Sequence, residues 1–236
     1  MEDIVLPDTS LCAIVRDEKM NPAGGVVRFL NSILPHVEEA VIVDTGSKDG
    51  TREILEQQKS RFPHLRVYDT KFEGYAQARN FSLEKVKTKM ALVLDADEII
   101  TQEDFPIILQ HISIPHHKGL HLNYREVTSE SYSDSNSNNS TLTNRIFRIE
   151  GHSYRNSDGW KYEHLLDNAK SFFRIDAKLV HFSAINYFLK LDNWYYSDAH
   201  QKGKAPSEVP GFAKWKSFNP KRNSYQASNL DVSSSS

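Results

Sequence analysis

Two aspartates separated by a single residue are the sharpest chemical feature of the sequence. They form Asp95-Ala96-Asp97, directly after the apolar run Met90–Leu94, whose composition is typical of a buried strand. Residues two apart on an extended chain point the same way, so both carboxylates can face one site. Crowded carboxylates repel each other unless a cation neutralises them, and Mg²⁺ or Mn²⁺ prefers oxygen ligands that it often shares with substrate phosphates. The pair predicts a metal–diphosphate site; the alternative is a solvated acidic turn at a helix start.

A second candidate loop runs from Asp44 to Thr51, after the apolar run Ala40–Val43. Asp44 stands at a predicted strand end, where its carboxylate can accept hydrogen bonds from a base or a ribose. Gly46 and Gly50 permit turn conformations that are closed to other residues. The loop matches neither the glycine fingerprint of dinucleotide sites nor a phosphate-binding P-loop, and a well-capped turn is the alternative interpretation.

A third candidate is Arg79, in the segment Tyr75–Val86, whose apolar residues have helical spacing. A guanidinium pairs well with phosphate oxygens, so Arg79 could bind a diphosphate. The alternative is an exposed helix arginine without a ligand.

The elements that must position these residues alternate along the first half of the chain. We predict buried strands at Leu11–Val15, Ala40–Val43, Leu65–Tyr68 and Met90–Leu94. We predict helices at Gly24–Val37, Thr51–Phe62, Tyr75–Val86 and about Gln102–His111. This rhythm indicates a parallel sheet with helices on both faces, in which ligands sit outside the carboxyl ends of the strands.

The second half has a different pattern. Short strands are expected at Leu120–Val127, Arg145–Ile149, Trp160–Leu165, Phe172–Ile175 and Lys178–His181. A loop rich in Ser and Asn is expected at Thr128–Thr143, a helix rich in aromatic residues at Ala184–His200, and a disordered tail at Ser233–Ser236.

Composition narrows the function classes. The 236 residues suit one α/β domain, and a net charge of −2 argues against a general nucleic-acid binder. Cys12 is the single cysteine and cannot form an internal disulfide, which favours a reducing compartment. The sequence shows neither a signal peptide nor an apolar run near the ~18 residues that span a bilayer. We therefore expect a cytoplasmic protein whose membrane contact, if any, is peripheral.

Taken together, these motifs resemble the family 2 glycosyltransferases, which have the GT-A fold. The match covers roughly residues 10–100 and looks closest to the branch with bacterial lipopolysaccharide-core glucosyltransferases. It consists of Cys12-Ala13-Ile14-Val15 with Glu18, Ile42–Thr51, Ala78-Arg79-Asn80 and Leu94–Glu98. The resemblance implies a Rossmann-like, mostly parallel central sheet with helices on both faces, plus a smaller mixed acceptor-side region. It also implies a nucleotide-sugar donor, usually a UDP-sugar, and usually inversion at the anomeric carbon.

The resemblance also assigns residues and a cofactor. Asp44 would contact the nucleoside, Asp95 the ribose or metal region, and Asp97 the metal directly, with Mn²⁺ or Mg²⁺ as the ion. The strand-end His181 would complete the metal site together with Asp97 and Asp95. The other positions expected to contact the nucleotide sugar are Val15, Glu18, Gly46, Arg79 and Ala96.

The catalytic base implied by the resemblance is Glu163. Tyr162-Glu163-His164 stands where relatives often carry a His-Glu pair, so the order here is reversed, and Asp158 and Glu150 are alternative carboxylates nearby. Arg145-Ile146-Phe147-Arg148 resembles the family's Arg-x-Phe-Arg strand.

These assignments divide the chain into a nucleotide-sugar-binding half (1–100), an acceptor and catalytic half (101–205) and a partly disordered extension (206–236). The acceptor would be a hydroxyl of a glycan or glycolipid. Two other functions stay open: a non-catalytic nucleotide-sugar or glycan-binding module, and a sugar nucleotidyltransferase. The latter usually has a loop rich in Gly and Lys/Arg after the first strand, whereas this chain has Arg16-Asp17-Glu18-Lys19.

Overall fold

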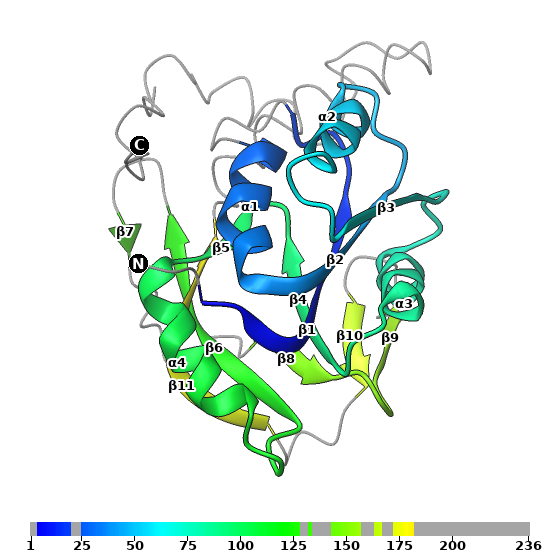
Figure 1. The fold of residues 1–236 in the computed structure, drawn as a ribbon. Coiled ribbons are helices and arrows are strands. Elements are labelled where there is room, and N and C mark those ends of the chain that lie inside the picture. Colours follow the sequence, from blue (N-terminus) through cyan, green and yellow to red (C-terminus); the bar gives the residue numbers. More distant parts are fainter. Residues whose placement is uncertain are drawn as a thin grey trace.

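The computed structural model of the chain describes residues 4–19, 25–127, 132–133, 143–156, 163–166 and 172–181. These residues form a large sheet with helices packed against it (Figure 1). The strand order is β3-β2-β1-β4-β8-β6-β11-β5, and β7 (Tyr132–Ser133) pairs with β6. Both predicted halves of the chain therefore contribute strands to one sheet.

The first half of the sheet is parallel. It consists of β1 (Leu6–Val15), β2 (Val37–Asp44), β3 (Leu65–Asp69) and β4 (Met90–Asp95). β1 lies between β2 and β4, and β3 pairs with the outer side of β2. The apolar runs of β1, β2 and β4 are almost wholly buried, as expected for parallel strands that are covered on both faces.

Alternate residues of β1 pack into two different cores. Leu11, Ala13 and Val15 join the helices α1 (Gly25–Ile33), α2 (Thr51–Gln58) and α4 (Phe105–Ile112) on one face. Cys12 joins α3 (Tyr75–Lys85) on the other face. Successive side chains of a strand point to opposite faces, so the sheet separates these two cores. The predicted α/β class with helices on both faces is confirmed.

The second half of the sheet is mixed. It consists of β5 (Glu98–Ile100), β6 (Gly119–Val127), β8 (Thr143–Arg148) and β11 (Phe172–His181). β8 is antiparallel to both β4 and β6, and β6 is parallel to β11. The short β5 follows β4 after two residues, yet it pairs antiparallel with β11 at the other end of the strand order. The sheet therefore curls, so that its β5 edge returns to the turn that joins β4 to β5.

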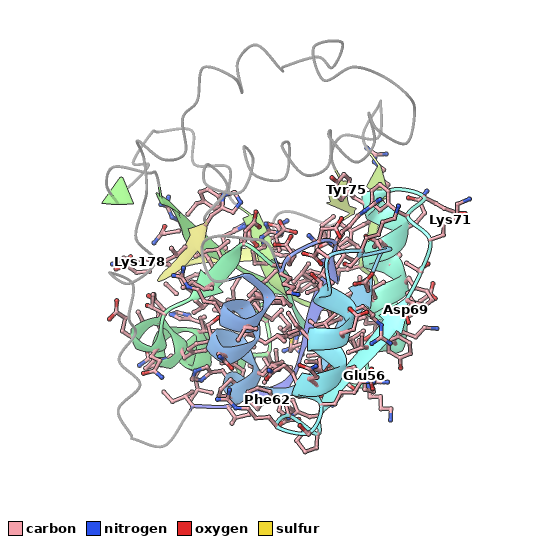
Figure 2. The ribbon with its side chains drawn as sticks, turned by 90° about the horizontal axis from the view of Figure 1, so that it is seen from above. Glu56, Phe62, Asp69, Lys71, Tyr75 and Lys178 are labelled. Carbon is pink, nitrogen blue, oxygen red and sulfur yellow. The ribbon has the colours of Figure 1, made fainter. Side chains whose placement is uncertain are left out.

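A separate two-stranded ribbon of β9 (Ser153–Asn156) and β10 (Glu163–Leu166) lies beside α3 in Figures 1 and 2. Figure 2 labels Tyr75 of α3 and Lys178 of β11 at opposite sides of the molecule.

Several predicted elements need correction. The first helix ends at Ile33, because a 3-10 turn at Leu34–His36 leads directly into β2. Phe172–Ile175 and Lys178–His181 are one strand, whose pairing with β6 is irregular between Arg174 and Lys178. β5, β7 and β9 were not predicted from the sequence, and β7 falls within the expected loop Thr128–Thr143. The predicted helix Ala184–His200, the tail, the extension 206–236 and most of Thr128–Thr143 lie outside the described residues.

Within the described ranges, no helix is long and apolar enough to cross a membrane.

Candidate active site

The candidate residues gather at the carboxyl ends of three adjacent strands. The register pairs Val15 of β1 with Asp44 of β2, and Ile14 of β1 with Asp95 of β4. Asp44 and Asp95 therefore lie on either side of β1, separated by two strand spacings of about 4.8 Å each. This is the edge of a parallel sheet where ligands bind in α/β proteins, and both carboxylates stand at strand ends as predicted.

Asp44 has one satisfied and one unsatisfied carboxylate oxygen. Its Oδ1 accepts hydrogen bonds from the backbone N–H groups of Gly46 (2.8 Å) and Ser47 (2.7 Å). Gly46 makes this tight turn with a φ of 106°, a conformation that favours glycine. Oδ2 is buried and has no hydrogen-bond partner among the described residues, although Asp44 is only 2% exposed. A buried acceptor without a partner is unfavourable, so Oδ2 is suited to an N–H or O–H donor supplied by a ligand.

The loops after β1 and β2 are held together by hydrogen bonds. The N–H of Asp17 donates to the Ser47 hydroxyl (2.9 Å), and the N–H of Lys48 donates to Oδ1 of Asp17 (2.7 Å). The N–H of the buried Glu18 donates to the Thr51 hydroxyl over 2.8 Å. The two loops form one rigid border beside Asp44.

Val15 and Ala96 are placed by the core. The carbonyl of Val15 accepts from the N–H (3.0 Å) and the hydroxyl (3.1 Å) of Thr45. Ala96 is buried in the core that includes α1 and α4. Both residues lie at the predicted edge, and their contact with a nucleotide sugar stays a prediction.

Arg79 does not lie where either sequence interpretation placed it. It is neither an exposed helix residue nor free to bind a diphosphate, because it is 1% exposed and forms an ion pair with Oδ1 of Asp95. It also donates to the carbonyl of Leu94 over 3.3 Å. Arg79 therefore anchors the end of β4 from the helix α3.

Arg145 of β8 completes the neutralisation of Asp95. Its Nη2 lies 3.1 Å from Oδ2 of Asp95 and also pairs with Oε1 of Glu98. Oε2 of Glu98 in turn accepts the backbone N–H of Asp95 over 2.9 Å. Both oxygens of Asp95 are thus bound to arginine, which leaves Asp97 as the carboxylate of the pair that is better suited to a metal.

The carboxyl groups of Asp95 and Glu98 titrate in opposite directions. Burial alone would raise the pKa of Asp95, but Arg79 and Arg145 outweigh it and hold this pKa well below its usual range. Burial raises the pKa of Glu98 to about 7, because Arg145 only partly offsets it and Asp95 adds like charge. Near neutral pH the turn therefore holds a charged Asp95 and a partly protonated Glu98.

Asp97 faces His181, which comes from the far end of the sheet. Oδ2 of Asp97 lies 3.8 Å from Nε2 of His181, and both side chains are mostly buried. The register of β11 with β5 sets this approach, because His181 lies opposite Glu98. Nδ1 of His181 is hydrogen-bonded to the hydroxyl of Tyr124 on β6. If Nδ1–H donates to that hydroxyl, Nε2 presents its lone pair on the side of Asp97.

Asp97 and His181 fit a metal that a substrate helps to hold. One carboxylate oxygen and one imidazole nitrogen are suitable ligands for Mn²⁺, whereas Mg²⁺ keeps more strictly to oxygen. Among the described residues there is no group of three or more His, Cys, Asp or Glu side chains able to bind a metal by themselves. The remaining ligands would have to be water and phosphate oxygens.

Glu163 is the first residue of β10, and the register pairs it with Asn156. It therefore lies at the end of the ribbon that is farther from the turn joining β8 to β9. Glu150 is exposed in that turn, next to the amino end of β4, because Arg148 pairs with Met90. Glu150 is thus on the wrong edge of the sheet for a base. Asp158 lies outside the described residues.

A model of the family described as "Glycosyl transferase family 2" matches residues 20–190. The chain belongs to this family. Members of family 2 are glycosyltransferases, so the chain carries a glycosyltransferase domain, and the matched range includes Asp44, Asp95, Asp97 and His181.

Two known proteins illustrate the relationship of this family 2 chain to others. The structure of S. aureus TarS 1-349 aligns with a TM-score of 0.56 and 17% identity, over 76% of this chain and 62% of that one. At this identity the likeness shows the fold. A TPR repeat-containing protein of Synechococcus elongatus is 32% identical over 110 residues, 47% of this chain. The chain spans only 25% of that relative's length.

Sequence analysis overlooked Tyr124 and did not assign a role to Arg145 or Glu98. Arg145 carried a signal, since it begins the Arg-x-Phe-Arg strand of family 2, and Glu98 continues the acidic motif. Tyr124 carried no such sequence signal, because nothing in its own segment indicates a contact with His181.

Proposed function

We propose that this protein is a metal-dependent glycosyltransferase that moves a sugar from a nucleotide-sugar donor to a hydroxyl of a glycan or glycolipid, with inversion. A UDP-sugar is the expected donor. The observation that carries the proposal is the placement of an unsatisfied oxygen of Asp44 and the Asp97–His181 pair at one edge of the sheet. Asp44 would bind the nucleoside, and the Asp97–His181 pair would lie at the diphosphate.

Asp44 is suited to bind a nucleobase that carries an N–H group. Its Oδ1 is fully occupied by the two backbone donors of the loop, which fixes the direction of the carboxylate. Oδ2 then has a defined orientation and lacks a partner among the described residues. A uracil N–H or a ribose hydroxyl would supply the missing hydrogen bond and remove the cost of about 1–3 kcal/mol that an unsatisfied buried group carries.

Asp97 and His181 would hold Mn²⁺, or Mg²⁺ with lower preference, together with the donor diphosphate. The ion would offset the negative charge that develops on the departing diphosphate. Arg79 and Arg145 oppose the charges of Asp95 and Glu98, which would limit the repulsion that a diphosphate meets at the acidic turn.

Glu163 is the proposed base. It would take the proton of the acceptor hydroxyl as that oxygen attacks the anomeric carbon, on the side opposite the diphosphate. Its place at the end of β10, on a ribbon separate from the sheet, is consistent with a group that approaches from the acceptor side. The acceptor would be a glycan or glycolipid, as in the lipopolysaccharide-core branch that the sequence resembles, and the reaction would take place in the cytoplasm or at the membrane surface.

Thermal-shift measurements with UDP-, GDP-, CMP- and dTDP-sugars, each with and without Mn²⁺, test the donor site. A ligand that binds only the folded protein at about 100 times its Kd should raise the Tm by about 5–10 °C. We expect this for one nucleotide class, only with metal, and not in Asp97→Ala or His181→Ala.

Asp69→Ala is the matched control. Asp69 also ends a parallel strand at this edge, where it pairs with Asp44, but its side chain is exposed and bound to Arg52. Figure 2 labels Asp69 and Glu56, the two acidic partners of Arg52. This variant should keep the metal-dependent shift. The donor class that stabilises the protein is then assayed for hydrolysis and transfer, where Glu163→Gln should lower turnover without changing nucleotide affinity.

Each alternative outcome has a definite meaning. No shift with any nucleotide at millimolar concentration would contradict the donor site. Binding without hydrolysis or transfer would favour the non-catalytic module, and near-normal turnover of Glu163→Gln would remove that residue from the role of base.

A further inference from the structure

Asn80 forms a two-point connection between α3 and the ribbon that carries Glu163. Its Nδ2 donates to the carbonyl of Tyr154 (2.8 Å), and its Oδ1 accepts the N–H of Tyr154 (2.7 Å). The carboxamide thus satisfies both backbone groups of one β9 residue, as a neighbouring strand would do. No sequence motif assigned a task to Asn80, which merely follows Arg79.

Side-chain contacts, not strand pairing, hold the ribbon to the rest of the described structure. Among the described residues, β9 and β10 pair only with each other. A two-stranded sheet is marginally stable in water unless it packs against another element. Tyr154 and Leu165 belong to an apolar cluster with Ala76 and Leu83 of α3, and the Tyr154 ring also lies edge-on to Phe147 of β8. Apolar contacts are non-directional, whereas the hydrogen bonds of Asn80 fix the position of β9 along the helix.

The same helix also fixes the metal side of the site. Arg79 binds Asp95 at the end of β4, while its neighbour Asn80 binds Tyr154 of β9. Two residues after Tyr154 in β9, Asn156 lies opposite Glu163. Two adjacent residues of α3 therefore contact both the end of β4, which leads into Asp97, and β9, which pairs with the strand that begins with Glu163.

We propose that Asn80 is a positioning residue, which sets the distance between Glu163 and the donor site by locking β9 onto α3. This inference rests on the proposed function, because it gives Glu163 the task of the base. Both polar atoms of the Asn80 carboxamide bind Tyr154, so Asn80 would act through the ribbon and not on the substrate. A displacement of about 1 Å at the reacting groups can lower a rate about 100-fold, so a loosened ribbon should show first in turnover.

Amide hydrogen exchange of the whole chain tests the lock without any substrate. Asn80→Ala removes both hydrogen bonds, and Asn80→Asp keeps the size but places a carboxylate oxygen against the Tyr154 carbonyl. Both variants should speed exchange at Tyr154 and in β10 by at least about 10-fold, while β1 and β4 stay as in the wild type. Glu84→Ala, at an exposed position of the same helix, is the control and should change neither. Unchanged exchange in the ribbon would overturn the lock.

A double-mutant cycle with Glu163→Gln tests the link to the base. With the donor class found above, Asn80→Ala should lower kcat about 10- to 100-fold and leave the calorimetric Kd for UDP with Mn²⁺ within about 2-fold. In the Glu163→Gln background the same substitution should lower kcat less than about 2-fold, because the group that Asn80 positions is already removed. Equal losses in both backgrounds would overturn the proposed link.

The proposed function and the positioning role of Asn80 would be contradicted by different experiments. If the wild type binds no UDP and turns over no donor, the proposed function is wrong, and this is known before Asn80 is changed. If the wild type is active, Glu163→Gln lowers kcat and Asn80→Ala has normal kcat, the inference about Asn80 alone is wrong.

Discussion

Arg145 donates to Oδ2 of Asp95 over 3.1 Å, and this contact joins the second half of the chain to the turn that carries Asp97. Arg145 lies on β8, which pairs with β4 directly, so the guanidinium reaches the end of its neighbouring strand. It is the second arginine on Asp95, after Arg79. The acidic turn is therefore held in shape by two arginines that lie outside the Asp95-Ala96-Asp97 motif.

Arg145→Met should destabilise the protein strongly and in a pH-dependent way. It leaves Asp95 and Glu98 close together with one arginine fewer, and removing one partner of a buried ion pair costs about 3–5 kcal/mol. Because the pKa of Glu98 lies at about 7, this group is mainly neutral at pH 5.5 and mainly charged at pH 8. The loss of unfolding free energy should therefore be smaller at pH 5.5. Urea unfolding at the two pH values measures it.

The control for this prediction is Arg52→Met. Arg52 also binds two carboxylates, Glu56 and Asp69, but at an exposed site. Exposed pairs contribute about 0–1 kcal/mol, so this variant should lose little at either pH. Equal losses in Arg145→Met and Arg52→Met would argue against a structural role for the buried network.

Tyr124→Phe should weaken the proposed metal site without unfolding the protein. It removes only the hydroxyl that holds Nδ1 of His181, and partners of this kind typically contribute 10- to 100-fold to metal affinity. We expect calorimetry with UDP present to show an apparent Mn²⁺ affinity lower by about 10-fold or more. The ¹⁵N shifts of the His181 ring should report a changed tautomer.

Tyr68→Phe controls for the loss of a tyrosine hydroxyl elsewhere. The Tyr68 hydroxyl accepts a hydrogen bond from Arg66, away from His181. This variant should bind Mn²⁺ as the wild type does. Normal Mn²⁺ affinity in Tyr124→Phe as well would show that His181 needs no orienting partner.

Glu39→Gln should reduce the loss of stability in acid. Burial alone would raise the pKa of Glu39, but hydrogen bonds from the Ser10 hydroxyl and the Lys87 N–H, together with Arg66, lower it. The folded state thus favours the charged form, so this contribution is present above about pH 4.5, the ordinary value, and is lost as the pH falls further. Urea midpoints between pH 7 and pH 3.5 should fall more steeply for the wild type than for the variant. Parallel curves would assign acid sensitivity to other groups.

The strand-end carboxylates could be predicted because their signal is local. The apolar runs before Asp44 and Asp95 are long enough to identify buried strands, and parallel strands bring their carboxyl ends to one edge. Element boundaries were less certain. The prediction of two strands in place of β11 left out Asp176 and Ala177, where the structure instead has an irregular pairing with β6 within a continuous strand.

The supporting residues could not be predicted, because their partners are distant in the sequence. α3 is buried toward both the sheet and the ribbon, so its periodicity does not show that Arg79 points into the core. Tyr124 meets His181 only because β6 and β11 are neighbours, and Asn80 meets Tyr154 only because the chain returns to α3. Three-residue β5 is too short to give a pattern of its own.

The pairing of β5 with β11 has a consequence for the growing chain. Asp95, Asp97 and Glu98 leave the ribosome well before Arg145 and His181, on which their arrangement depends. Until β8 and β11 have emerged, the acidic turn has neither its second arginine nor its histidine, and closing so long a stretch of chain is a slow step. A nascent polypeptide that stops short of His181 therefore lacks the Asp97–His181 pair, so the proposed metal site would be completed only late in biogenesis.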